Sequence, residues 1–243
     1  DSIRIGGASG YWGDSDMALP QFLKAGGLDY IVFDYLAEIT MSIMARQRAK
    51  DPAQGYAADF VSGLKPHLKE IARQKVKILS NAGGVNPRAC GEAMRAVVKA
   101  AGLDLKVAVV EGDDLLARAG ELGGVKEMYS ADAFPAPERL ASINAYFGGF
   151  PIAEALKHGA DIVITGRSVD SAVTLGACIH AFGWSREDVD RLAAGSLCGH
   201  VLECGAQATG GNFTDWESVA ETMWEIGYPI AEIGADGIFT VTK

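Results

Sequence analysis

Short runs of apolar residues alternate along the chain with longer stretches in which apolar side chains recur every three or four positions. Short runs are typical of buried strands, and periodic stretches are typical of amphipathic helices. The runs predict strands at residues 2–5, 30–33, 76–79, 105–110, 142–147, 161–165 and 237–241. The periodic stretches predict helices at residues 16–25, 37–50, 60–75 (with a break at Pro66), 87–101, 115–119, 150–157, 169–180, 188–194 and 216–226. This repeated order predicts an α/β fold, namely a Rossmann-like, mostly parallel open sheet with helices on both faces.

The strand–helix order runs through the whole chain, which predicts a single α/β domain over residues 1–243. The order breaks down between residues 121 and 150. There Gly123-Gly124 and the Phe-Pro-Ala-Pro run at 134–137 favour turns over regular structure. We therefore expect an irregular insertion or a lid at 121–150.

The turn after the predicted strand 161–165 carries the polar side chains of Arg167, Ser168, Asp170 and Ser171. It lies between a strand's C-terminal end and a helix's N-terminus, which is where ligands bind in open α/β sheets. Two interpretations stay open for three of these residues, because Ser168 can simply cap the helix, and Asp and Ser are common in a first helical turn. Arg167 favours a functional role, since a cation beside a helix N-terminus does not stabilise that helix.

Other predicted strand ends also carry unusual polar or glycine residues. These are Ser9 and Gly10 after the first strand, Asp34 and Glu38 after the second, and Asn81, Gly83 and Gly84 after the third. Glycine-rich loops can hold phosphate or carboxylate oxygens through backbone N–H groups, or they can serve only as tight turns. The loop after the first strand has neither the spacing of a dinucleotide fingerprint nor that of a P-loop. Because the ends of parallel strands share one edge, we expect one crevice with anion sites, an arginine and several carboxylates, which suits acid–base chemistry on an anionic small molecule.

A second group of reactive residue types lies between residues 195 and 211, where His200, Glu203 and Cys204 fall close together. Such residues can ligate a metal or form a nucleophile–base pair. Their H-x-x-E-C spacing matches no established zinc signature, and cysteines of this kind usually serve as small apolar side chains. We therefore expect no metal, and we keep His200 and Glu203 as candidate catalytic residues.

Charge and composition exclude some classes of function. The formal net charge of −9 argues against a nucleic-acid-binding surface and against a polybasic membrane patch. No apolar run approaches the ~20 residues of a membrane span, and no signal peptide is visible before the first strand. The four cysteines are expected to be free thiols. We therefore expect a cytoplasmic homo-oligomer whose partner is a small-molecule substrate, with no binding to nucleic acid or membrane.

Several longer segments carry a family resemblance. They are IRIGGASGYWGDS, FDYLAEITMSIMARQRAKDPAQGYAADFV, NAGGVNP, DIVITGRSVDSA with the following IHAFGW, and GHVLECGAQATGGNF. Together they resemble the acyclic terpene utilisation AtuA-type family, and the likeness covers nearly the whole chain. Such a resemblance implies a role in the catabolism of acyclic terpenes such as citronellol and geraniol, which proceeds through branched acyl-CoA thioesters. Members of the family are usually longer, so the resemblance implies that this chain is either a single domain or the N-terminal part of a longer family chain.

Two functional hypotheses result. The first is an enzyme of lyase, hydratase or hydrolase type that acts by acid–base chemistry on a small carboxylate or a branched acyl-CoA thioester, with no cofactor assigned. Its candidate catalytic residues are Asp34, Glu38, Asp170, His200 and Glu203. Its candidate substrate- or anion-binding residues are Ser9, Gly10, Asn81, Gly83, Gly84, Arg167, Ser168 and Ser171. The second hypothesis is a non-catalytic ligand-binding or scaffold subunit of a catabolic assembly.

Overall fold

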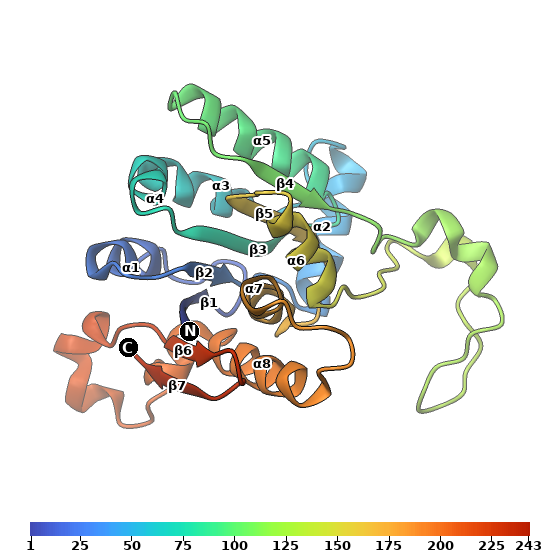
Figure 1. The fold of residues 1–243 in the computed structure, drawn as a ribbon. Coiled ribbons are helices and arrows are strands. Elements are labelled where there is room, and N and C mark those ends of the chain that lie inside the picture. Colours follow the sequence, from blue (N-terminus) through green and yellow to red (C-terminus); the bar gives the residue numbers. More distant parts are fainter.

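The computed structural model describes residues 1–243, which form a seven-stranded sheet with helices on both faces (Figure 1). The strands are β1 (Ser2–Ser9), β2 (Tyr30–Phe33), β3 (Lys77–Gly84), β4 (Val107–Val110), β5 (Ile162–Gly166), β6 (Ile230–Gly234) and β7 (Phe239–Thr242). The α-helices are α1 (Ala18–Ala25), α2 (Glu38–Lys50), α3 (Ala58–Leu64), α4 (Leu68–Gln74), α5 (Pro87–Ala100), α6 (Gly149–Lys157), α7 (Ala172–Phe182) and α8 (Val189–Leu202). Short 3₁₀ helices occupy η1 (Lys65–His67), η2 (Leu116–Leu122), η3 (Pro137–Arg139), η4 (Gly205–Thr209) and η5 (Trp216–Glu225).

The strand order across the sheet is β4-β5-β3-β2-β1-β6-β7. Strands β1 to β5 are parallel to one another, whereas β6 pairs antiparallel with both β1 and β7. The predicted α/β fold with a mostly parallel sheet is confirmed, and the antiparallel edge is an addition to it. After β3 the chain moves outward to β4, and after β5 it returns across the sheet to β6. The order therefore reverses between the neighbouring strands β3 and β5, and an open α/β sheet forms its ligand crevice at such a point.

Two hydrophobic cores lie on opposite faces of the sheet. Helices α1 to α5 cover one face with side chains such as Phe22, Phe60 and Met94, which are all buried. Helices α6 to α8 cover the other face with side chains such as Ile152 and Leu202. The strands between them are apolar on both faces, as parallel strands between two helical layers must be. No helix has both the length and the apolar character needed to cross a bilayer.

Several predicted boundaries were wrong. The loops predicted after the first and third strands begin later than expected, because β1 continues to Ser9 and β3 continues to Gly84. The chain turns from Gly10 and from Val85 instead. The helix predicted at 188–194 continues to Leu202 as α8, and β6 was not predicted. Residues 142–147 form no strand and make only isolated bridges. The helix predicted at 60–75 is interrupted at Pro66 as expected, since η1 separates α3 from α4.

The segment between β4 and α6 leaves the body of the domain and returns to it. Its middle part, which contains η2 and η3, projects away from the sheet (Figure 1). Most of its side chains are exposed, including Met128 and Tyr129 near its tip. We call residues 116–143 the arm. The chain that returns from the arm carries Asn144 and Tyr146 back to the C-terminal edge of the sheet, where Phe147 bridges to Ser168.

Candidate active site

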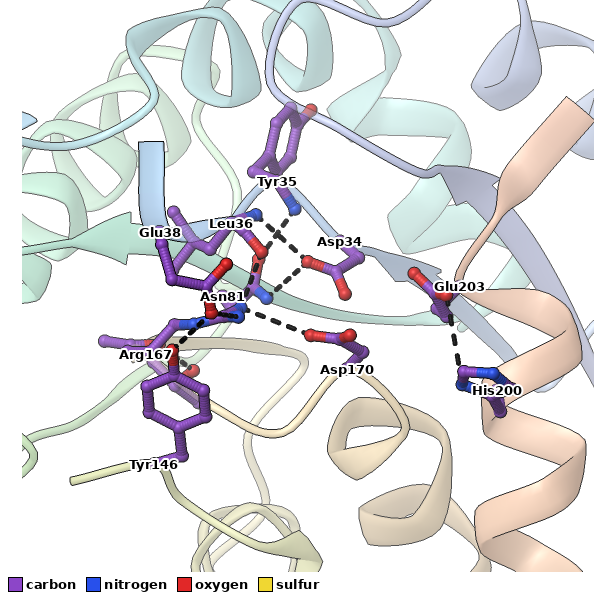
Figure 2. Close-up of polar contacts among 12 residues, drawn as sticks. Asp34, Tyr35, Leu36, Glu38, Asn81, Tyr146, Arg167, Asp170, His200 and Glu203 are labelled. Carbon is purple, nitrogen blue, oxygen red and sulfur yellow. Dashed lines mark hydrogen bonds and ion pairs between the residues drawn. The ribbon is translucent and has the colours of Figure 1, made fainter. Parts of the chain in front are cut away.

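The polar residues of the strand ends meet at the C-terminal edge of the sheet, beside the point where the strand order reverses (Figure 2). Asp34 directly follows β2, and Asn81 lies within β3. Arg167 and Asp170 lie in the turn between β5 and α7. Glu203 lies at the C-terminal cap of α8, and the extension of this helix beyond its predicted end brings it to the same edge. Four separate segments therefore contribute charged or amide side chains to one place.

Asp34 is the most buried carboxylate of this group, with 2% of its surface exposed. Its Oδ1 accepts hydrogen bonds from Asn81 Nδ2 at 2.6 Å and from the Leu36 backbone N–H at 3.0 Å, whereas its buried Oδ2 has no partner. Asn81 is held in this orientation because its Oδ1 accepts the Tyr35 backbone N–H at 2.8 Å. Burial raises the pKa of Asp34 to about 7, against the two hydrogen bonds, which lower it. Asp34 is thus a carboxyl group that titrates near neutrality and has one oxygen free.

Asp34 is one of three carboxylates that lie close together, and we call Asp34, Asp170 and Glu203 the acidic cluster. An oxygen of each lies within 4.8 Å of an oxygen of the other two. Burial also raises the pKa of Glu203, and the charge of Asp170 adds to that rise, while a hydrogen bond from the Cys204 thiol at 3.1 Å lowers it. Carboxylates this close share protons or a cation, because they cannot all stay charged without compensation. These three are also the residues that could hold a divalent metal, since Mg²⁺ and Ca²⁺ prefer oxygen ligands.

Arg167 lies beside the acidic cluster, and its side chain is only 4% exposed. Nη1 donates to the Leu36 carbonyl at 2.5 Å and lies 3.3 Å from Asp170 Oδ1. Nη2 lies 3.4 Å from Glu38 Oε1, while the buried Nε has no partner. The guanidinium stacks over the ring of Tyr146, with 4.3 Å from its carbon to the ring centroid. A fixed, buried cation is therefore available at the edge of the cluster.

Glu38 and Tyr146 form the outer side of the site. The Tyr146 hydroxyl donates to Glu38 Oε1 at 2.7 Å, and this bond is the main cause of the lowered pKa of Glu38, with a further contribution from Arg167. Glu38 is the first residue of α2, and its side chain is 80% exposed. Glu38 is therefore a charged carboxylate on the solvent-exposed side of the site, whereas Asp34 is buried.

The turn that carries Arg167 is held by Asp113, a buried residue that follows β4. Asp113 Oδ2 accepts the Arg167 backbone N–H at 2.7 Å and Asn144 Nδ2 at 2.8 Å. The sequence analysis did not select Asp113, Asn144 or Tyr146. Asp113 had a detectable signal, since it follows a predicted strand as Asp34 does. Tyr146 had none, because it falls within the strand predicted at 142–147, which the structure does not form.

The predicted anion-binding residues fall into three structural groups. Ser9 Oγ donates to the Asp34 carbonyl at 3.0 Å, and the Gly10 N–H donates to Asp14 Oδ2 at 2.9 Å, so both donors are already paired. Gly83 and Gly84 lie in β3, packed closely against the Thr165 carbonyl and the Met44 side chain.

Ser168 and Ser171 form the third group, in the turn before α7. Ser168 Oγ is buried and has no partner. Helix α7 begins at Ala172 with Ser171 at its N-cap and no side-chain cap bond. The capping interpretation of Ser168 was therefore wrong, and its hydroxyl is a free donor near Arg167.

His200 and Cys204 lie at the margin of the site. The His200 side chain is 73% exposed, and its Nδ1 lies 4.0 Å from Glu203 Oε1, beyond hydrogen-bond range. Burial, together with the bond to Glu203, raises the pKa of Cys204 to about 11. A thiol in that state is not a nucleophile at neutral pH. Of the residue group at 195–211, the structure brings Glu203 into the acidic cluster and leaves His200 outside it.

Comparison with known proteins gives one match. The model of the family described as acyclic terpene utilisation family protein AtuA matches residues 3–243. No curated protein and no solved structure matches the chain. The family is therefore known, whereas the roles of the residues at this edge of the sheet must be argued from their chemistry.

Proposed function

This chain belongs to the acyclic terpene utilisation AtuA family, and from that premise we propose that it is a catabolic enzyme that moves protons on a small carboxylate or a branched acyl-CoA thioester. The single observation that carries the proposal is Asp34. This carboxyl group is buried, has a free oxygen and has a pKa of about 7. General acid–base catalysis works best when the pKa of the catalytic group lies near the working pH.

The neighbours of Asp34 have distinct roles in this proposal. Burial is the main cause of the raised pKa of Asp34, and the charges of Asp170 and Glu203 add to it. Removing a proton from a carbon next to a carbonyl places negative charge on the carbonyl oxygen. Arg167 and the unpartnered hydroxyl of Ser168 are the donors that stabilise such a charge. Lyases, hydratases and hydrolases can all use this pairing of a proton-transfer group with donors for a developing oxyanion.

Turnover of a small carboxylate or of its CoA thioester tests the proposal. With at least one branched short-chain acid or thioester, we expect the thermal midpoint of the protein to rise. We also expect mass spectrometry to detect a product formed from that compound. Asp170→Asn should reduce the rate by about 10²-fold, the lower end of an acid–base contribution. Glu111→Gln is the matched control, because Glu111 is an exposed strand-end carboxylate outside the acidic cluster. Equal rates for Asp170→Asn and Glu111→Gln would show that the acidic cluster takes no part in the mechanism.

A non-catalytic subunit of a catabolic assembly is the second candidate function. The observation that favours it is the arm, whose tip exposes 88% of Tyr129. Large exposed apolar side chains are typical of contacts with another chain, and the same surface supports a homo-oligomer. Binding of a ligand without any turnover in the assay above would favour this candidate.

Divalent metals are expected to have little effect on the protein. The acidic cluster can be neutralised by a shared proton or by a metal ion, and Arg167 at 3.3 Å from Asp170 already supplies a positive charge that repels a second cation. Millimolar Mg²⁺ or Mn²⁺ should therefore shift the thermal midpoint by less than about 2 °C, which corresponds to less than roughly 1 kcal/mol. A larger shift in thermal midpoint that disappears in Asp34→Asn would show that the acidic cluster binds a metal ion instead.

A further inference from the structure

Arg167 already holds a carboxylate, that of Glu38. One oxygen of Glu38 accepts the Tyr146 hydroxyl at 2.7 Å and lies 3.4 Å from Arg167 Nη2. The contact to Arg167 is long for a charge-assisted hydrogen bond, whose usual length is about 2.7–2.9 Å. Glu38 is also 80% exposed, so its carboxylate can leave for water without a large cost. Glu38 is therefore a loosely held ligand at a tightly held cation.

The remaining donors of Arg167 are poorly satisfied. Nε and Nη2 form one edge of the planar guanidinium, an edge that binds the two oxygens of a carboxylate in parallel. On this edge Nε is buried without a partner, and Nη2 has only the distant Glu38 oxygen. The opposite side is fixed, since Nη1 donates to the Leu36 carbonyl. An unpaired buried donor costs free energy, which a ligand with two acceptor oxygens would recover.

We propose that Glu38 is an internal stand-in for the carboxylate of the substrate, and that the site takes a small free carboxylic acid rather than a CoA thioester. This inference rests on the proposed function and specifies its substrate. The substrate carboxylate binds the Nε–Nη2 edge of Arg167 and accepts the Tyr146 hydroxyl, and Glu38 turns out into solvent. A thioester is neutral at the carbonyl and cannot replace a carboxylate at this edge.

The position of the acidic cluster limits which bond of the acid reacts. Asp170 lies 3.3 Å from Nη1, on the side of the guanidinium away from the Nε–Nη2 edge, and Asp34 and Glu203 lie near it. An acid held at the Nε–Nη2 edge therefore meets these proton-transfer groups with carbons that extend past the guanidinium.

Binding of three related probes tests the proposal by calorimetry on the whole chain. The probes are 3-methylbutanoate, its uncharged amide, and its CoA thioester. We expect the acid to bind at least about tenfold more tightly than the amide. Glu38→Gln keeps an acceptor for Tyr146 but removes the competing charge, so it should tighten binding of the acid by about fivefold, the effect of one unit charge at ~4 Å in water. Tyr146→Phe should weaken it.

The control variant is Glu92→Gln, an exposed glutamate on α5 that is far from Arg167 in the chain and should leave the binding of the acid unchanged. Equal binding of acid and amide, or weaker binding of the acid by Glu38→Gln, would overturn the stand-in role. Binding of the thioester alone would overturn the substrate class while leaving the proposed enzyme function in place. Tight binding of the acid without any turnover would overturn the proposed enzyme function while leaving the substrate class in place.

Discussion

Replacing Asp34 with asparagine is expected to lower turnover by about 10²- to 10⁴-fold, the usual contribution of a general acid or base. Asparagine has the same shape and keeps an Oδ1 that can accept from Asn81 Nδ2 and from the Leu36 N–H. The local structure should therefore survive, while the group that exchanges a proton is lost. Steady-state rates of Asp34→Asn and of the control Asp104→Asn, an exposed aspartate outside the site, measure the effect.

The same variant should change the pH dependence of stability. The pKa of Asp34 is raised from 3.8 to about 7, so between these pH values the unfolded chain has lost the proton and the folded chain keeps it. The stabilisation from this group is thus complete below pH ~4 and is lost as the pH rises to about 7. Asp34→Asn lacks this loss, so above pH 7 it should be more stable than the natural protein, by up to about 4 kcal/mol.

Thermal midpoints at pH 5 and pH 8 separate catalysis from folding. We expect the midpoint of Asp34→Asn to exceed that of the natural protein at pH 8 and to approach it at pH 5. Glu203 keeps its own raised pKa in the variant, so part of the pH dependence will remain. A variant that loses activity and stability together at both pH values would show that Asp34 serves only the fold.

Much of the site could be predicted from local sequence, because its main residues follow strands with strong signals. The runs Tyr30–Phe33 and Ile162–Gly166 are buried on both faces, and the parallel pairing of β2, β3 and β5 then brings Asp34, Asn81 and Arg167 to one edge. Glu203 was selected for a different reason, its closeness in sequence to His200. Its actual partners are Asp34 and Asp170, which the extended helix α8 brings near.

The outer part of the site could not be predicted, since it depends on contacts between segments that lie far apart in the sequence. Tyr146 reaches Glu38 across 108 positions, and Asp113 reaches the Arg167 backbone across 54. Neither contact has a local signature. The first contact joins the chain that returns from the arm to Glu38, and the second joins the chain that enters the arm to the turn of Arg167. Packing of the arm and placement of Arg167 therefore depend on each other.

The glycines near the first strand show why a residue type alone does not reveal its role. Glycine serves where a loop needs freedom, where a ligand approaches the backbone, and where another part of the chain does. At Gly7, another part of the chain approaches the backbone. A Cβ there would lie 2.2 Å from the backbone oxygen of Leu202, at the end of α8. The sequence before Asp14 therefore encodes a close approach between a strand and a helix rather than an anion loop.

Gly7→Ala is accordingly expected to destabilise the protein by at least about 3 kcal/mol, at the upper end for overpacking of a core. The clash is with backbone, which cannot rotate away, and β1 is fixed between β2 and β6. Helix α8 must move instead, and Glu203 at its end moves out of the acidic cluster. The thermal midpoint should fall by roughly 6–12 °C, and any folded remainder should have lost turnover.

Gly63→Ala provides the matched control, because Gly63 lies within α3 and a Cβ there would meet nothing within 4 Å. It should raise stability by about 0.5–1 kcal/mol, the usual gain from alanine in a helix. If Gly7→Ala were as stable as this control, α8 could not pack against β1 as closely as described. Glu203 would then have no fixed position beside Asp34, and the raised pKa of Asp34 would have to arise from burial and from the charge of Asp170.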